Sequence, residues 1–180
     1  NFDYSKTDGD LVRSQLGIKK NASVIGYIGR LSHEKNLFML MESFAKASIN
    51  HPHMVLVLVG QGMLQMALKK MANELNIESK TIFCGIREDI AAILSSFDIF
   101  VLPSFIEGLS NALLEAMASG RAIICSNIDG NRTLITNNIE GILIDPKDSE
   151  SLTLNMELLS RDQLLREKLG KNAKIKAQEY

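Results

Sequence analysis

Two carboxylates stand alone in an otherwise apolar, helix-forming stretch, PSFIEGLSNALLEAMASG, from Pro103 to Gly120. An unpaired charge among leucine, alanine and methionine side chains is costly, so Glu107 and Glu115 are candidates for contact with a ligand. Their spacing corresponds to about 12 Å along a helix, roughly the span of a sugar joined through a diphosphate to a ribose. Because carboxylates accept hydrogen bonds from hydroxyl groups, Glu107 is predicted to bind a hexose and Glu115 a ribose.

Two cations follow the first apolar run, in the turn GYIGRLSHEKN from Gly26 to Asn36. Arginine offers phosphate oxygens a rigid fork of donors, and lysine offers a movable point charge. Gly29 allows the backbone to approach a ligand closely. Arg30 and Lys35 together therefore predict a diphosphate site. The alternative is that both are ordinary surface charges of a loop.

The helix in the Pro103 to Gly120 stretch is expected to begin near Gly108 to Ser110. A capping box from Ser104 to Glu107 is an alternative start, but it would place Gly108 inside the first turns, at a cost of about 1 kcal/mol relative to alanine. With the later start, the free backbone amides of Gly108, Leu109 and Ser110 form an anion site at the helix N-terminus.

Two further turns carry weaker signals. The turn CGIRED brings Gly85 and Arg87 to the end of an apolar run, where a flat base could lie against exposed backbone. The alternative is that Asp89 caps the next helix and Arg87 is solvated. The glycines of VGQGM, from Val59 to Met63, allow a ligand or a neighbouring loop to approach the backbone.

Other classes of site have little support. The first turn lacks the third glycine of a dinucleotide fingerprint, and no phosphate-loop motif occurs, which disfavours a nicotinamide or flavin enzyme. His33 has no nucleophile or second histidine near it in the sequence, so it is expected to be inert. Asp8 and Asp10 are expected to cap a short helix, and no metal site is predicted.

The composition favours one globular domain. A chain of 180 residues can bury roughly 70% of the surface that its unfolded form exposes. The net charge is −1, with both signs spread along the chain, which disfavours nucleic-acid binding. Cys84 and Cys125 stand singly in apolar runs and are expected to be buried thiols in a reducing compartment. Without a signal-peptide core or an apolar stretch of about 18 residues, a soluble chain is expected.

Short apolar runs alternate with helix-forming segments along the chain. The runs lack strict alternation, as expected for parallel strands buried on both faces: 23–29, 54–60, 81–85, 98–103, 121–126 and 141–146. Asn36 is expected to be the N-cap of the helix that follows the first run. Ser160 and Gln163 are expected to form the capping box of the last helix. The helices between these two are expected at about 62–75, 88–96, 109–119, 130–137 and 149–159.

This alternation predicts a doubly wound α/β domain with a six-stranded, mainly parallel sheet and right-handed crossovers. Such sheets bind ligands at the carboxyl ends of their strands. The turns that carry the two cations and the two carboxylates both follow strands. They are therefore expected to lie at the same edge of the sheet.

These motifs resemble the C-terminal, donor-binding half of the group 1 glycosyltransferases, the retaining family four enzymes. The resemblance runs from about residue 19 to the end, through GRLSHEKN, LVGQG, FCG, DIFVLPSFIEGLSNALLEAMASG and GNRTLITNNIEGILIDP. It implies one half of a GT-B enzyme, in which two Rossmann-like domains face each other. Residues 1–18 are then expected to be an interdomain linker with a short helix that leads into the domain. Residues 19–180 are expected to be the nucleotide-sugar-binding domain, with the N-terminal acceptor domain absent.

The resemblance also implies roles by position. Arg30 and Lys35 would bind the diphosphate and stabilise its charge as it leaves, and Glu107 would contact the transferred sugar, so these three are the expected catalytic residues. The expected donor-binding residues are Arg30, Lys35, Gly29, Arg87, Gly108, Leu109, Ser110 and Glu115. The implied reaction moves a hexose, with retention, from a nucleotide diphosphate sugar to a glycan or lipid-linked acceptor held by the absent domain. UDP is the expected carrier, because it is the commonest one in the family.

The family needs no metal or other cofactor, so none is expected here. A cytoplasmic enzyme is expected, associated peripherally with the inner face of the cell membrane in its full-length form. Many relatives have proline where Ser110 and Ala122 stand and glycine where Asn36 stands, and Ser110 could alter the contact with the sugar. The chain alone is expected to bind nucleotide sugar weakly and to transfer nothing. The alternatives are a sugar-nucleotide 2-epimerase of the same architecture and a non-catalytic nucleotide-sugar-binding module.

Overall fold

A computed structural model describes residues 9–180 of the chain. Within them, six strands form one sheet with only parallel pairings, in the order β3-β2-β1-β4-β5-β6. The strands are β1 Ser23–Ile28, β2 Met54–Val59, β3 Thr81–Gly85, β4 Ile99–Leu102, β5 Ala122–Ser126 and β6 Ile142–Ile144. Each strand lies within one of the predicted apolar runs, so the predicted doubly wound α/β fold is confirmed.

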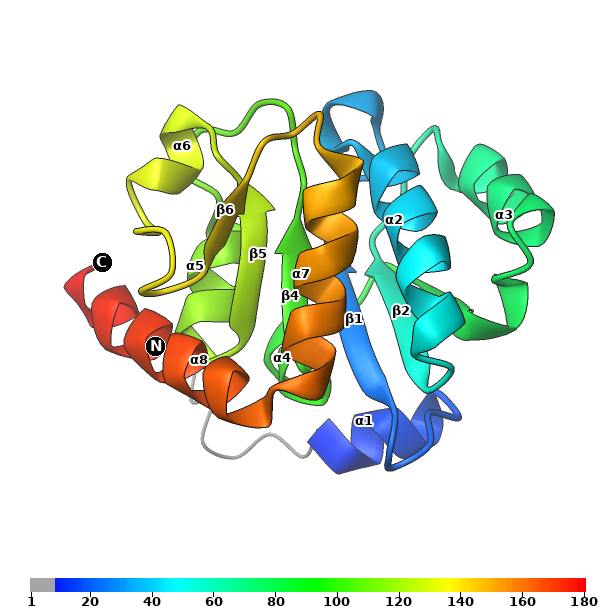
Figure 1. Cartoon of the computed structure of the whole chain (residues 1–180), viewed down its shortest axis with the longest axis horizontal. Coiled ribbons are helices and arrows are strands. Elements are labelled where there is room, and N and C mark those ends of the chain that lie inside the picture. The colour runs from blue at the N-terminus through cyan, green and yellow to red at the C-terminus, as the bar shows by residue number, and fades with distance from the viewer. Residues whose placement is uncertain (1–8) are drawn as a thin grey trace.

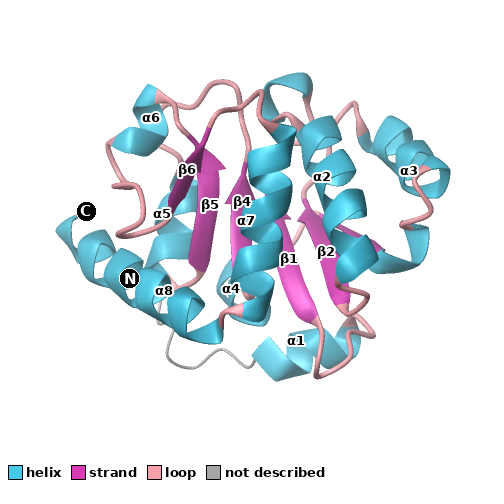
Figure 2. Cartoon of the chain, in the orientation of Figure 1, coloured by secondary structure: helices cyan, strands magenta, loops and turns pink. Residues whose placement is uncertain are grey.

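Helices cover both faces of the sheet (Figures 1 and 2). Helices α2 (Leu37–Asn50) and α7 (Ser149–Arg161) pack against each other in front of the sheet, and α4 (Ile90–Ser96) and α5 (Asn111–Ala118) lie behind it. The other helices are α1 Gly9–Gln15, α3 Gln65–Glu74, the short α6 Asp129–Arg132 and α8 Gln163–Lys176. Three 3-10 turns are η2 His33–Lys35, η3 Glu78–Lys80 and η4 Ala177–Glu179. The carboxyl ends of the strands point to the top of Figure 1, where the predicted site loops lie.

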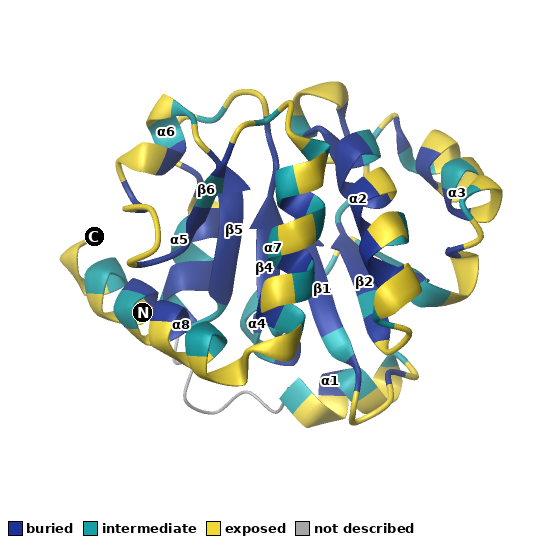
Figure 3. Cartoon of the chain, viewed as in Figure 1, coloured by how far each residue is buried: buried dark blue, intermediate teal, exposed yellow. Residues whose placement is uncertain are grey.

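The centre of the sheet is the core of the domain (Figure 3). Strands β1, β2, β4 and β5 consist almost wholly of buried residues, whereas β3 is only partly buried after its first residue. Cys125 in β5 is buried, as predicted, and burial raises the pKa of its thiol. Cys84 in β3 is partly exposed, so its prediction as a buried thiol was wrong. The reason is that β3 is an edge strand, with a neighbour on one side only.

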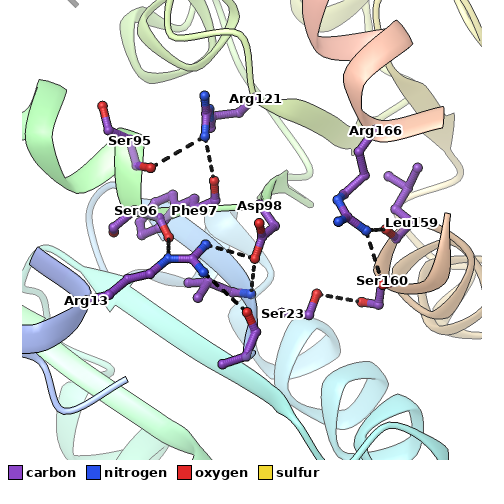
Figure 4. Close-up of polar contacts among 12 residues, drawn as sticks. Arg13, Ser23, Ser95, Ser96, Phe97, Asp98, Arg121, Leu159, Ser160 and Arg166 are labelled. Carbon is purple, nitrogen blue, oxygen red and sulfur yellow. Dashed lines mark hydrogen bonds and ion pairs between the residues drawn. The ribbon is translucent and has the colours of Figure 1, made fainter. Parts of the chain in front are cut away.

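Arg13 ties helix α1 to the end of the sheet opposite the predicted site (Figure 4). Its Nε donates a 2.8 Å hydrogen bond to the carbonyl of Ser96, and its Nη2 lies 2.9 Å from Oδ2 of Asp98. The same carboxylate oxygen accepts a 2.7 Å hydrogen bond from the amide of Val24. Helix α1 is therefore packed into the domain. The predicted cap Asp8 lies outside the described residues.

Two helix boundaries differ from the sequence prediction because nearby side chains bind the backbone amides. The helix predicted over 130–137 is only α6, since the amide of Thr136 donates a 2.7 Å hydrogen bond to Oε2 of Glu140. Ser160 lies inside α7, so its predicted capping box with Gln163 was wrong. Asp162 caps α8 instead and accepts a 2.9 Å hydrogen bond from the amide of Leu165.

Candidate functional site

The strand order places a ligand-binding crevice between β1 and β4. The chain passes outward from β1 to β2 on one side and from β4 to β5 on the other, so the order reverses between β1 and β4. Open α/β sheets bind ligands at such switch points. A cavity of about 320 Å³ opens there, and its lining includes Gly29, Arg30, Lys35, Glu107 and Ser110. Predicted site residues from two separate turns therefore meet in one cavity.

Glu107 is the centre of the polar contacts in this cavity. Its Oε1 accepts a 2.7 Å hydrogen bond from Nζ of Lys35 and a 2.6 Å hydrogen bond from Oγ of Ser104. The side chains of Lys35 and Glu107 are only 20% and 9% exposed, so water screens this ion pair weakly. The carboxylate that looked isolated in the sequence has a cation as its partner, 72 residues earlier in the chain.

Glu107 also lines a second cavity, of about 410 Å³, on the side of β5. The exposed apolar side chains of Phe105 and Ile106 contribute to it from the same loop, and Asp129 and Arg132 contribute from α6. Arg132 is ion-paired with Asp129. Glu107 therefore stands between a cavity lined by Arg30 and Lys35 and one lined by Phe105 and Ile106.

Asn36 joins the first turn to two other strand-end loops. The sequence predicted it as an N-cap, and it does occupy that position, but its side chain makes no capping hydrogen bond. Its buried Nδ2 instead donates to the carbonyls of Pro103 at 3.1 Å and Pro146 at 2.8 Å. The amide of Phe105 adds a 2.9 Å hydrogen bond to the carbonyl of Glu34. These bonds hold the loop of Glu107 against the turn of Lys35, and sequence reasoning missed them.

Tyr27 supports the same turn from below. Its hydroxyl donates a 2.8 Å hydrogen bond to the carbonyl of Arg30. Burial raises the pKa of the Tyr27 phenol, and the nearby negative charges of Glu107 and Glu34 raise it further, so the phenol stays protonated as a donor. A Cβ atom at Gly29 would lie 2.5 Å from the Tyr27 hydroxyl. Glycine at position 29 therefore leaves room for this support.

The turn VGQGM accommodates the neighbouring loop, one of the two possibilities raised by the sequence. A Cβ atom at Gly60 would lie 2.0 Å from the carbonyl oxygen of Gly29, and one at Gly62 would lie 2.2 Å from that of Leu31. Leu64 donates its amide to the same Leu31 carbonyl at 3.0 Å. Helix α3 consequently begins after this contact, three residues later than the predicted start at 62.

Helix α5 begins where the sequence predicts. Ser110 is its N-cap, and its Oγ accepts a 3.3 Å hydrogen bond from the amide of Leu113. The alternative capping box does not form, because Ser104 bonds to the carboxylate of Glu107 instead. Within residues 9–180, the backbone amides of 108–110 donate no hydrogen bond, so they are free to bind an anion. Of these three residues, Ser110 lines the cavity, whereas Gly108 and Leu109 do not.

Glu115 differs from Glu107 in its surroundings. It lies on α5 one turn after Ala112, which lines the first cavity, so the two residues share a helical face. Burial raises the pKa of the Glu115 carboxyl, and no ion pair involves it in the described part of the chain. It therefore stands just beyond the cavity as a partly desolvated acceptor.

Arg87 is not brought to the cavity. It follows β3 at the edge of the sheet, two strands away from β1. Its Nε and Nη2 donate to the two carboxylate oxygens of Asp89 at 2.7 and 2.6 Å, and this guanidinium holds the pKa of Asp89 below its usual value. Asp89 occupies the N-cap position of α4, as the alternative expected, but its side chain makes no capping hydrogen bond and pairs with Arg87 instead. Contact between this loop and a base stays a prediction.

Across residues 9–180, no group of three or more histidine, cysteine, aspartate or glutamate side chains is placed to hold a metal ion. No helix in the same range is long and apolar enough to cross a membrane. A further cavity, of about 290 Å³, lies around the amino ends of β2 and β3 and contains none of the predicted site residues.

The chain matches a family model, described as glycosyl transferases group 1, over residues 8–176. Among curated proteins, it is 38% identical to the Escherichia coli UDP-Gal:alpha-D-GlcNAc-diphosphoundecaprenol alpha-1,3-galactosyltransferase over 161 residues. That match covers 87% of this chain and 41% of the relative. The chain thus spans less than half of the length of that enzyme.

Solved structures share the fold. A crystal structure of Anabaena Alr3699/HepE in complex with UDP-glucose aligns with a TM-score of 0.90 at 24% identity, over 99% of this chain and 51% of that one. The C-terminal domain of a group 1 glycosyl transferase, LpcC from Francisella tularensis, aligns with a TM-score of 0.82 at 24% identity. The second alignment covers 93% of this chain and 91% of that domain.

Proposed function

The chain belongs to the group 1 glycosyl transferases, and on that premise we propose that it is the donor-binding half of a retaining hexosyltransferase. The proposed donor is a UDP-linked hexose. The proposed acceptor is a lipid-linked or other glycan, held by a second domain outside this chain. The observation that carries the proposal is the meeting of Arg30, Lys35, Glu107 and the N-terminus of α5 in one cavity at the switch point.

The names of two similar proteins support the choice of substrates. The relative from Escherichia coli is named for a UDP-galactose donor and a diphosphoundecaprenol-linked acceptor. The HepE structure was solved in complex with UDP-glucose. An acceptor of the first kind would place the full-length enzyme at the inner face of the cell membrane. We propose that this region then associates with the membrane peripherally, through the acceptor.

In the mechanism that we propose, the diphosphate of the donor lies between Arg30, Lys35 and the amides of 108–110. Breaking the bond to the sugar leaves negative charge on the departing UDP, and donors already aimed at that position stabilise it as it develops. The sugar becomes oxocarbenium-like in the same step. A metal ion has no place in this mechanism, because two cations and a helix N-terminus neutralise the phosphates.

The two carboxylates have separate roles in the mechanism. Lys35 has three N–H donors, so it can bind a phosphate oxygen while it keeps its contact with Glu107. Glu107 lines both cavities, which suits a contact with the hexose at the junction between them. Glu115, one turn along α5, accepts hydrogen bonds from the ribose hydroxyls.

Nucleotide binding by the isolated chain tests the donor site. Thermal unfolding is measured with UDP, GDP, ADP and their sugars, and selective stabilisation by UDP is expected, about 2.7 kcal/mol at a hundredfold excess over the Kd. Lys35→Ala should abolish most of this shift. Lys46→Ala, which removes an exposed lysine on α2, should leave it unchanged. No shift with any nucleotide at millimolar concentration would contradict the proposal.

The reaction itself is tested with the full-length protein that contains this domain. UDP-hexoses are supplied with GlcNAc-diphosphoundecaprenol, and NMR of the product should show retained anomeric configuration. Isomerisation of the nucleotide sugar without an acceptor would instead identify a 2-epimerase. Binding without turnover in the full-length protein would indicate a non-catalytic module.

A further inference from the structure

We propose that Ser104 is a positioning residue, which fixes Glu107 through Oε1 and leaves Oε2 as the oxygen that meets the donor sugar. This inference rests on the proposed function and deepens it. Ser104 is fully buried two residues after the end of β4. Its hydroxyl contacts the carboxylate at 2.6 Å, a short distance typical of a hydrogen bond to a charged acceptor.

The two oxygens of Glu107 are in different situations. Oε1 accepts hydrogen bonds from both Lys35 and Ser104. Oε2 has no hydrogen-bond partner within residues 9–180, and it is not among the fully buried atoms that lack one. Solvent or a ligand can therefore reach Oε2. A sugar hydroxyl that donates to this oxygen would complete the contacts of the carboxylate.

Of the two donors to Oε1, Ser104 is the one that the diphosphate does not engage. When the donor binds, Lys35 divides its N–H donors between the diphosphate and Glu107, so it no longer serves the carboxylate alone. A free glutamate side chain loses rotamer entropy when a ligand orders it. The hydroxyl of Ser104 removes part of that cost, because it holds the carboxylate before the sugar arrives.

The backbone around Ser104 is held on both sides. The carbonyl of Pro103 accepts a 3.1 Å hydrogen bond from Asn36, and the amide of Phe105 donates a 2.9 Å hydrogen bond to Glu34. Both partners belong to the turn that carries Lys35. Ser104 is thus placed rigidly relative to the cation as well as to the carboxylate.

The chain offers a matched control for the removal of this hydroxyl. Ser126 ends β5, is fully buried like Ser104, and its Oγ has no hydrogen-bond partner among the described residues. Each of the two substitutions, Ser126→Ala and Ser104→Ala, therefore removes one buried hydroxyl group near the end of one of two neighbouring strands. Only the second change removes a contact with Glu107.

The experiment compares dissociation constants of the chain for UDP and for four UDP-hexoses, those of galactose, N-acetylgalactosamine, glucose and N-acetylglucosamine, by calorimetry. For the sugar that binds best, the ratio of the UDP constant to the UDP-sugar constant reports the contact with the hexose. We expect Ser104→Ala to lower this ratio about fivefold while UDP binding stays unchanged. Ser126→Ala should change neither quantity. Ser104→Thr, which keeps the hydroxyl, should retain the ratio, and Glu107→Gln should lose it.

The outcomes separate this inference from the proposed function. An unchanged ratio in Ser104→Ala, an equal loss in Ser126→Ala, or a parallel loss of UDP binding would overturn the positioning role. So would a loss in Ser104→Thr equal to that in Ser104→Ala when the two unfolding midpoints match. A wild-type chain that binds UDP with no gain from any sugar would also overturn it. A wild-type chain that binds no nucleotide would instead overturn the proposed function.

Discussion

The turns that follow β1 and β3 look alike in sequence and differ in the structure. Each has a glycine at or just after the end of its strand and a cation within two residues of that glycine, Gly29 with Arg30 and Gly85 with Arg87. The first turn also supplies Lys35, which pairs with Glu107, 72 residues away. Arg87 pairs with Asp89, two residues away. Arg87 is therefore neutralised within its own turn, whereas Lys35 is paired with a residue of another loop.

The position of each strand in the sheet explains the difference. Strand β1 is central, and its neighbour β4 ends in the loop that carries Glu107 and the N-terminus of α5. Strand β3 is at the edge, beside β2 alone. Where the neighbouring strand end supplies complementary groups, a cation at a strand end can bind the same ligand as those groups. At the edge of the sheet, the cation is instead neutralised by a residue of its own turn.

The largest expected effect is that of Lys35→Ala on the full-length enzyme. In the proposed mechanism, loss of this cation removes charge stabilisation from the departing UDP and leaves Glu107 without its ion pair, so kcat should fall by about 10²–10³. Steady-state kinetics with saturating donor measure it. A fall no larger than that of Arg87→Ala would show that the two turns are equivalent.

Glycine substitutions that affect the two turns should differ in how much they lower the free energy of unfolding. Gly60→Ala would press a Cβ atom within 2.0 Å of the Gly29 carbonyl, at a φ of 127°. It should lower the free energy of unfolding by roughly 3 kcal/mol and weaken UDP binding, since the first turn must move. Gly85→Ala also has positive φ but meets no atom within 4 Å, so about 1 kcal/mol is expected. Urea unfolding measures both, and equal losses would contradict the difference.

Glu115→Gln should affect affinity more than stability. Loss of the charged acceptor that we propose for the ribose should weaken UDP binding about tenfold, as measured by calorimetry. Burial raises the pKa of Glu115, so the ionised carboxyl destabilises the fold at neutral pH. That cost disappears as the pH falls through the raised pKa toward the ordinary value. The substitution should therefore stabilise the chain slightly, by about 0.5 kcal/mol after solvent screening, at neutral pH only. A gain in stability that persists in acid would contradict this assignment.

Arg87→Ala should have the smallest effect. Its pair with Asp89 is partly exposed, and such pairs contribute about 0–1 kcal/mol. The backbone of 85–87, which could face a base, stays in place. UDP affinity should change by less than about threefold. A loss as large as that of Arg30→Ala would place the Arg87 side chain in the site after all.

Much of the fold and part of the site follow from local sequence. The six strands were predicted because buried parallel strands are short, continuous apolar runs. The start of α5 followed from the cost of Gly108 inside a helix, and Lys35 and Glu107 were selected by residue type and by position after a strand. The end of α6 and the cap of α8 were missed, because side chains of Glu140 and Asp162 competed for the backbone amides.

The sequence by itself determined which side chains have the chemistry for a diphosphate and a sugar, because charge and hydrogen-bonding capacity belong to each residue. Only the tertiary structure decided which of them work together. It joined Lys35 to Glu107, assigned Ser104 to one carboxylate oxygen, and kept Arg87 at the sheet edge. These choices depend on strand order and on contacts between distant segments. No local pattern records them, since a hydrogen bond requires its partner within about 3 Å in space and at no particular distance in sequence.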